Sequence, residues 1–403
     1  MEQRLKFYFW FLTIASVVLV GFNLLQDRQF SWTADEGYYY TFASSFAQEG
    51  FACFPKLFHS FWSVPKLQWY PTPSRLGYII PAGLCFKLWP SMAVLGFFSF
   101  LCYVISLYVN THFALKILKH KVTAYAMTAV LAASPLLMAM GRRALTESLL
   151  FLLWSSLLWL CTDYIINKQR KHLGWICGLL IWALMVKEST IALFPLILAV
   201  AWLGREGRSL PWREWLSITL SLVLGLFLIP GLLVGFERWI HHLIALQELG
   251  RQAVHVNPYV KQYCQGPWFR YLVDAMLLSP IVTLMAVGYL GHILLKKDDF
   301  KLAYLWLAFF LTVYLSCISL QMNVRYVIGL EAVYSLFAVL FLAQLTERFS
   351  NQIVKERVWL AGVSLIIVTN WMFFYQIFVV RGLLDPISCH LLVLQHFIPP
   401  YGL

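Results

Sequence analysis

The chain has 403 residues, of which 60% are hydrophobic and only 12% are charged, about half the charge of an average soluble protein. Its apolar runs are long enough to cross a bilayer, which takes about twenty helical residues, so a soluble protein is excluded. The net charge of +12 would suggest a nucleic-acid partner in a soluble chain, but here it indicates basic cytoplasmic loops and no nucleic acid.

Long apolar runs predict an all-α polytopic membrane protein with about 11 transmembrane helices and further helices at its extracytoplasmic surface. The first run is too long for a signal peptide core and lacks a small-residue cleavage site, so we expect it to be retained. The run 76–88 is short and suits a re-entrant segment. We see no repeat or linker and expect one transmembrane domain over residues 1–403. The predicted spans are 7–25, 94–115, 122–140, 144–166, 173–186, 189–203, 216–236, 271–295, 302–322, 326–345 and 358–380.

Two long outer segments, 26–75 and 237–270, are expected to be loops that cover a candidate active site. Within the first, residues 36–48 suit a helix in the membrane interface. A cytoplasmic N-terminus places five basic turns inside, as the positive-inside rule requires: 116–121, 168–172, 205–213, 296–301 and 348–357. We therefore expect a multi-pass protein, of the kind found in a bacterial inner membrane, with its site on the periplasmic face.

The cysteines and histidines do not form a metal-binding pattern, because there is no CxxC or zinc spacing. His241 and His242 are adjacent and would point in different directions on a helix, so a shared ion is not supported. We expect no required cofactor; a divalent metal is not supported by these residues. A disulfide between Cys53 and Cys264 is open, since both fall in predicted outer segments and sequence cannot fix the pairing.

Nearly all the unusual charges fall at the outer ends of the predicted helices. Ionisable groups near a bilayer are costly, about 2.5–3.5 kcal/mol at mid-depth, so their gathering at one face predicts a shared polar cavity. The alternative is that helix ends simply carry charged residues. The residues concerned are Asp35, Glu36, Arg75, Arg142, Arg143, Glu147, Lys187, Glu188 and Arg325.

Each of these residues has a plain structural interpretation beside the functional one. Arg143 and Glu147 are four residues apart, which suits an internal ion pair as well as a guanidinium fork for phosphate. Lys187 interrupts the apolar run 173–203, as a turn or as a phosphate-binding ammonium. Glu331 lies deep in its helix and needs a partner, for which Arg325 and Lys187 are the candidates.

One acid among several basic residues suits a particular chemistry. A sugar on a lipid phosphate already has a good leaving group, so its transfer needs one carboxylate to accept the acceptor proton and cations to hold the phosphate. Hydrolysis of a plain glycoside would need two carboxylates in paired roles.

The residues suited to this chemistry occur within a series of short motifs along the chain. They are Asp35-Glu36, Pro73-Ser-Arg75-Leu, Ser134-Pro135, Arg142…Glu147, Lys187, Pro267-Trp268…Tyr271…Ser279-Pro280 and Asn323-x-Arg325-Tyr326. Over roughly residues 5–345 the series resembles the GT-C superfamily of polyprenyl-phosphate-sugar glycosyltransferases, of the protein O-mannosyltransferase and lipid A aminoarabinose transferase type.

The resemblance implies a GT-C fold and an inverting glycosyltransferase with an undecaprenyl- or dolichyl-phosphate sugar as donor. It implies Asp35 as catalytic base, with Glu36 able to exchange roles with it, and Glu147 as a supporting acid. It implies donor-phosphate contacts by Arg75, Lys187 and Arg325, assisted by Arg142 or Arg143. The prolines here precede Arg75, whereas the family's loop usually reads Arg-Pro-Pro-Leu.

The resemblance does not decide whether the acceptor of the sugar is a lipid, a glycan or a protein. Membrane lipids are expected to surround the protein. Two other functions stay open, a transporter or flippase of lipid-linked sugars and a lipid-linked glycan ligase or polymerase. A flippase needs polar groups on both sides of its path, whereas the charges here are predicted on one side.

Overall fold

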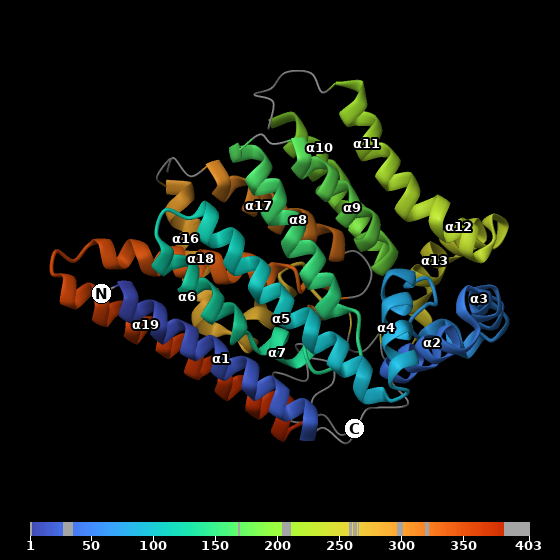
Figure 1. Ribbon diagram of the computed structural model, residues 1–403, viewed down its shortest axis with the longest axis horizontal. Coiled ribbons are helices and arrows are strands. Elements are labelled where there is room, and N and C mark those ends of the chain that lie inside the picture. Colours follow the sequence, from blue (N-terminus) through green and yellow to red (C-terminus); the bar gives the residue numbers. More distant parts are fainter. Residues whose placement is uncertain are drawn as a thin grey trace.

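The computed structural model describes residues 2–26, 35–167, 170–203, 211–257, 260, 264, 266–295, 301–318 and 322–382, and the regular structure in these ranges is helical (Figure 1). Six helices are long and apolar enough to cross a membrane, which supports a polytopic helical protein and leaves the predicted count of 11 as a prediction. They are α1 (Glu2–Gln26), α5 (Met92–Ile117), α8 (Glu147–Asn167), the continuous segment Trp212–Val234, α18 (Leu330–Glu347) and Gln352–Val380. The shorter apolar helices are α4 (Leu76–Leu88), α6 (Lys121–Ala132), α9 (Arg170–Val186), α10 (Phe194–Leu203), α16 (Pro280–Leu295) and α17 (Lys301–Cys317).

Two predicted spans, 122–140 and 271–295, are each divided in the structure at a Ser-Pro dipeptide. The first becomes α6 and α7 (Pro135–Met140), and the second becomes α15 (Arg270–Leu278) and α16. Proline lacks the amide hydrogen that a continuing helix needs, but its fixed φ suits the first position of a new one. Ser134 caps α7, since its hydroxyl accepts from the amide of Leu137 at 3.3 Å.

The predicted loop 237–270 is largely a helix, α13 (Phe236–Val256). Gly235 separates it from the short α12 (Ile229–Val234). The backbone of Gly235 has a φ of 99°, a conformation that glycine adopts more readily than other residues. The charges of the segment suggested a loop, but Trp239 and His242 recur at helical spacing and both are buried. The helix is amphipathic and packs by one face.

The first outer segment also folds into helices, and the helix predicted over residues 36–48 is confirmed as α2. It contains α2 (Asp35–Glu49), α3 (Cys53–Ser63) and a 3₁₀ turn (Pro65–Trp69). In Figure 1, α2, α3 and α4 lie together beside α12 and α13. Gly83 of α4 allows close approach to α2, because a Cβ there would lie 2.6 Å from Phe46 Cδ1.

The disulfide left open between Cys53 and Cys264 does not form. Cys53 is a buried free thiol in α3. The backbone carbonyl of Cys264 instead accepts from the amide of Met322 at 2.8 Å, which ties residue 264 to the segment before α18. Cys389 lies outside the described residues.

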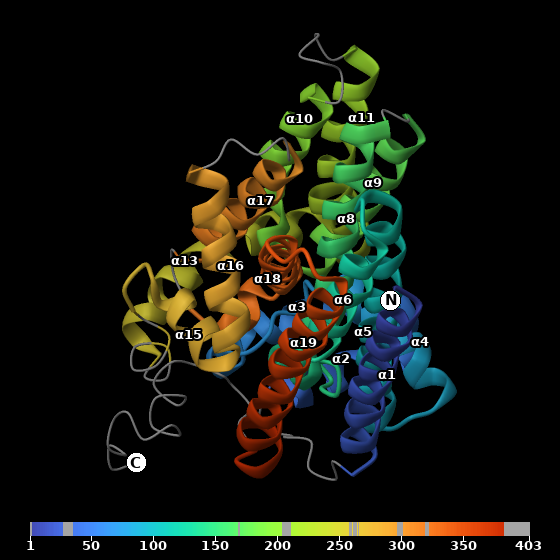
Figure 2. The same ribbon diagram turned by 90° about the vertical axis from the view of Figure 1, so that its left-hand side faces the viewer.

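The first and last described helices, α1 and α19 (Gln352–Phe374), pack together (Figure 2). The Tyr8 hydroxyl lies 2.8 Å from Ser364 Oγ, and Trp371 Nε1 donates to Ser16 Oγ at 3.0 Å. These bonds satisfy polar groups within apolar helices, where an unpaired group would be costly.

Candidate active site

A pocket of about 370 Å³ lies where several helix ends meet. Its charged lining residues come from four separate parts of the chain: Asp35, Arg75, Glu147 and Lys187. Both predicted outer segments contribute to its wall, through residues such as Tyr70 and Leu246. The expected sharing of one polar cavity is thus confirmed for these four charges, while their chemical roles stay predictions.

The adjacent acids at the start of α2 have different surroundings. The Asp35 side chain is 36% exposed and lines the pocket, and its Oδ2 lies 3.2 Å from Arg325 Nη2. Glu36 is buried, 3.1 Å from Arg143 Nη1, and accepts from the amide of Ala144 at 3.0 Å. Consecutive residues on a helix point about 100° apart, so only Asp35 faces the pocket.

The two arginines before α8 are not among the residues that line the pocket. Arg142 Nη2 donates to the carbonyl of Phe378 at 2.5 Å, and its guanidinium carbon lies 5.6 Å from the Phe374 ring centroid. Arg143 pairs with Glu36 and not with Glu147, so the ion pair inferred from helical spacing is wrong. These contacts oppose the suggestion that either arginine assists phosphate binding at this pocket.

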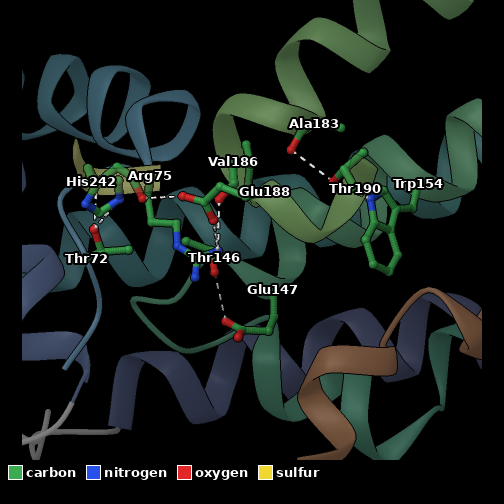
Figure 3. A network of polar contacts seen from close by, with 11 residues as sticks. Thr72, Arg75, Thr146, Glu147, Trp154, Ala183, Val186, Glu188, Thr190 and His242 are labelled. Carbon is green, nitrogen blue, oxygen red and sulfur yellow. Dashed lines mark hydrogen bonds and ion pairs between the residues drawn. The ribbon is translucent and has the colours of Figure 1, made fainter. Parts of the chain in front are cut away.

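Glu147 begins α8 and lines the pocket while buried among its neighbours. Its Oε2 accepts from Thr146 Oγ1 at 3.4 Å (Figure 3). The carboxylate is therefore held at the pocket wall, at a helix N-terminus that favours negative charge.

Lys187 provides a buried cation at the pocket. It lies in the connection between α9 and the 3₁₀ turn Glu188–Leu193, and its Nζ is 4.1 Å from the Tyr326 ring centroid. No described residue forms a hydrogen bond with Nζ. Burial lowers the pKa of Lys187 to about 8, an effect that the nearby Glu147 carboxylate partly opposes. A buried ammonium without a hydrogen-bond partner among the described residues favours binding of an anion that can accept its hydrogen bonds.

Arg75 is held by a second acid, Glu188. Arg75 Nη1 lies 3.7 Å from Glu188 Oε2 and donates to the carbonyl of Val186 at 3.3 Å. The Ser74 hydroxyl donates a short hydrogen bond to the other Glu188 oxygen. Burial would lower the pKa of Arg75, but Glu188 and neighbouring groups raise it overall, so the guanidinium stays charged.

Several residues of this network were not singled out as site residues from the sequence. Glu188 is among the charges predicted to gather at one face but has no predicted role in the chemistry, and the sequence assigns Thr72, Ser74 and His242 no role in the site. Figure 3 shows Thr72 beside His242 and Glu188 beside Arg75. The signal available was the position of Ser74 next to Arg75 in a segment stiffened by prolines.

Glu331 does not pair with Arg325 or Lys187 as expected. Its Oε2 accepts from Ser134 Oγ at 2.7 Å, so the hydroxyl that caps α7 also satisfies this acid. Arg325 is directed to Asp35 instead.

Comparison with protein-family models and with curated proteins finds no match to this chain.

Proposed function

We propose that the protein is an integral membrane inverting glycosyltransferase. It moves a monosaccharide from a polyprenyl-phosphate donor to an acceptor hydroxyl at the extracytoplasmic face. The observation that carries the proposal is the buried Lys187 ammonium, which has no hydrogen-bond acceptor among the described residues, in the same pocket as the part-exposed Asp35 carboxylate.

The reaction is a single displacement. Asp35 accepts the proton of the acceptor hydroxyl as that oxygen attacks the anomeric carbon, and the bond from this carbon to the phosphate oxygen breaks. The leaving group is polyprenyl phosphate, whose growing negative charge is stabilised by Lys187 and Arg75. Arg325, 3.2 Å from Asp35, favours the ionised form that a base needs.

The charge balance of the pocket favours a donor with one phosphate. Among the described lining residues, two cations face two acids, and Arg75 is also opposed by Glu188. One phosphodiester negative charge matches the Lys187 ammonium, whereas a diphosphate would bring a second charge that only Arg75, already opposed by Glu188, could meet. We expect diphosphate-linked sugars to be poor donors.

The proposal is tested with purified protein in nanodiscs and a panel of radiolabelled polyprenyl-phosphate monosaccharides. Wild type should release polyprenyl phosphate with one donor, and Asp35→Asn should lower the rate at least 100-fold. Glu49→Gln is the matched control, since Glu49 lies at the far end of the same helix and pairs with the exposed Lys56.

Equal rates for wild type and Asp35→Asn would exclude Asp35 as the base. If no donor in the panel supports sugar transfer, and lipid-linked sugar moves between liposome leaflets, the flippase is supported instead.

A further inference from the structure

His242 connects the helix that covers the pocket to the segment that carries Arg75. We propose that His242 is a positioning residue, which acts through Thr72, Ser74 and Glu188 to orient Arg75 toward the donor phosphate. This inference rests on the proposed function. It adds His242, which lies outside the sequence motifs described above, to the residues that support donor binding.

His242 is held in one orientation by aromatic neighbours. It is fully buried in α13, and its ring is stacked on Trp239 with centroids 5.3 Å apart and planes at 28°. Phe58 and Trp62 approach from α3 at centroid distances of 4.9 and 5.5 Å. Burial lowers the pKa of His242 to about 4, so the ring is neutral at physiological pH.

The ring makes one hydrogen bond to a described residue. His242 Nε2 lies 3.3 Å from Thr72 Oγ1, while Nδ1 is buried with no hydrogen-bond partner in the described part of the chain. The same Thr72 oxygen accepts from the amide of Ser74 at 3.3 Å. Thr72 is therefore fixed from both sides, with the rigid Pro73 between it and Ser74.

Ser74 connects Thr72 to Arg75 through Glu188. Its hydroxyl donates to one oxygen of Glu188. The other Glu188 oxygen lies 3.7 Å from Arg75 Nη1 (Figure 3). The other described bond of Arg75 is to the carbonyl of Val186, so Glu188 is the charged group that sets the direction of the guanidinium. A shift of Thr72 would release Ser74 and leave Glu188 free to turn.

The helix that carries His242 also forms part of the pocket wall. Leu246 and Leu249, one and two turns further along α13, line the pocket. The network thus joins a covering helix to a phosphate-binding side chain, which gives His242 a functional consequence beyond packing.

The test measures binding of radiolabelled undecaprenyl phosphate to purified protein in nanodiscs. His242→Ala and Thr72→Val should each weaken binding about 5- to 10-fold, and the double variant should be no weaker than either single one. Thr72→Ser keeps the hydroxyl and should restore affinity. His241→Ala is the matched control, because the adjacent His241 is exposed and also contacts Trp62, at 5.5 Å between ring centroids, whereas the hydrogen bond to Thr72 is made by His242.

A second arm separates positioning from packing. In an Arg75→Ala background, His242→Ala should cause no further loss of affinity. A further loss of the same size would overturn the route through Arg75, even if both proteins are well folded by their thermal midpoints.

The outcomes also separate this inference from the proposed function. If wild type binds undecaprenyl phosphate and both His242→Ala and Thr72→Val bind equally well, the positioning role is wrong and the transferase proposal stands. If wild type does not bind undecaprenyl phosphate, the proposed function itself is wrong.

Discussion

At the scale of the residue, Asp35 and Glu36 show how one helix turn can carry two unlike carboxylates. Glu36 is buried against Arg143 and the Ala144 amide, whereas Asp35 is part-exposed beside Arg325. A buried pair that loses one partner leaves an uncompensated charge, but a part-exposed pair is screened by water. Stability and catalysis are therefore expected to depend on different members of this dipeptide.

The first prediction concerns Glu36. Glu36→Gln removes the charge opposite Arg143 and should lower the free energy of unfolding by about 3–5 kcal/mol. Asp35→Asn should change the thermal midpoint little while lowering the transfer rate at least 100-fold. Thermal unfolding of both variants in one detergent measures this, and an unchanged midpoint for Glu36→Gln would contradict the structural role.

The second prediction concerns the pH dependence set by Lys187. With a pKa of about 8, its ammonium is charged at neutral pH and lost above it, so undecaprenyl phosphate affinity should fall as pH rises from 7 to 9. The ligand's own second ionisation, near pH 6, is already about 90% complete at pH 7 and changes little in this window. Lys187→Arg should hold affinity up to pH 9 because a guanidinium stays charged.

The same shift has a consequence for stability. The folded-state pKa lies below the ordinary value of 10.5, so the unfolded state binds more protons between about 8 and 10.5. The contribution of Lys187 to the free energy of unfolding should therefore rise with pH through that window. Lys187→Met should weaken phosphate binding by about 10- to 150-fold, the value of a charge-assisted hydrogen bond, without lowering the thermal midpoint at pH 7.

At the scale of the element, the packing of α2 on α4 places Asp35 at the pocket. The third prediction is that Gly83→Ala costs about 1–3 kcal/mol and lowers transfer, because the new Cβ would meet Phe46 Cδ1 at 2.6 Å and the Ala43 carbonyl at 3.0 Å. Gly178→Ala in α9 is the control, with nothing within 4 Å of its Cβ. Equal thermal midpoints for the two variants would show that α2 does not depend on this contact.

The sequence predicted elements well where apolar content alone decides them. The run 76–88 coincides with α4, and the Ser-Pro dipeptides that divide two spans were visible as motifs. Helix α13 was missed because its charged residues suggested a loop, while its buried face depends on neighbours such as Phe58.

The site was predictable in the type of its charges, but not in their direction. Asp35, Arg75, Glu147 and Lys187 could be found because ionisable groups are rare in an apolar chain. Which way Arg142 and Arg143 point depends on helices far away in sequence, as the Arg142 bond to Phe378 shows. The contact between Thr72 and His242 spans 170 residues and leaves no local pattern.

At the scale of the whole molecule, the proposed orientation makes the fourth prediction. Trp69, 52% exposed beside the pocket, should face the extracytoplasmic side, and His120, in the basic turn after α5, the cytoplasm. In a background lacking the eight native cysteines, Trp69→Cys should react with an impermeant thiol reagent in intact cells. His120→Cys should react only after permeabilisation. The reverse labelling pattern would show that the protein has the opposite orientation in the membrane.

The pairing of α1 with α19 affects how the protein is made. Tyr8 and Ser16 find Ser364 and Trp371 only after more than 350 intervening residues have left the ribosome. At a synthesis rate of about 5–20 residues per second, α1 spends tens of seconds in the bilayer before this partner exists. Assembly of the described bundle therefore depends on a late-made helix, and a chain that stalls before α19 should be a substrate for membrane quality control.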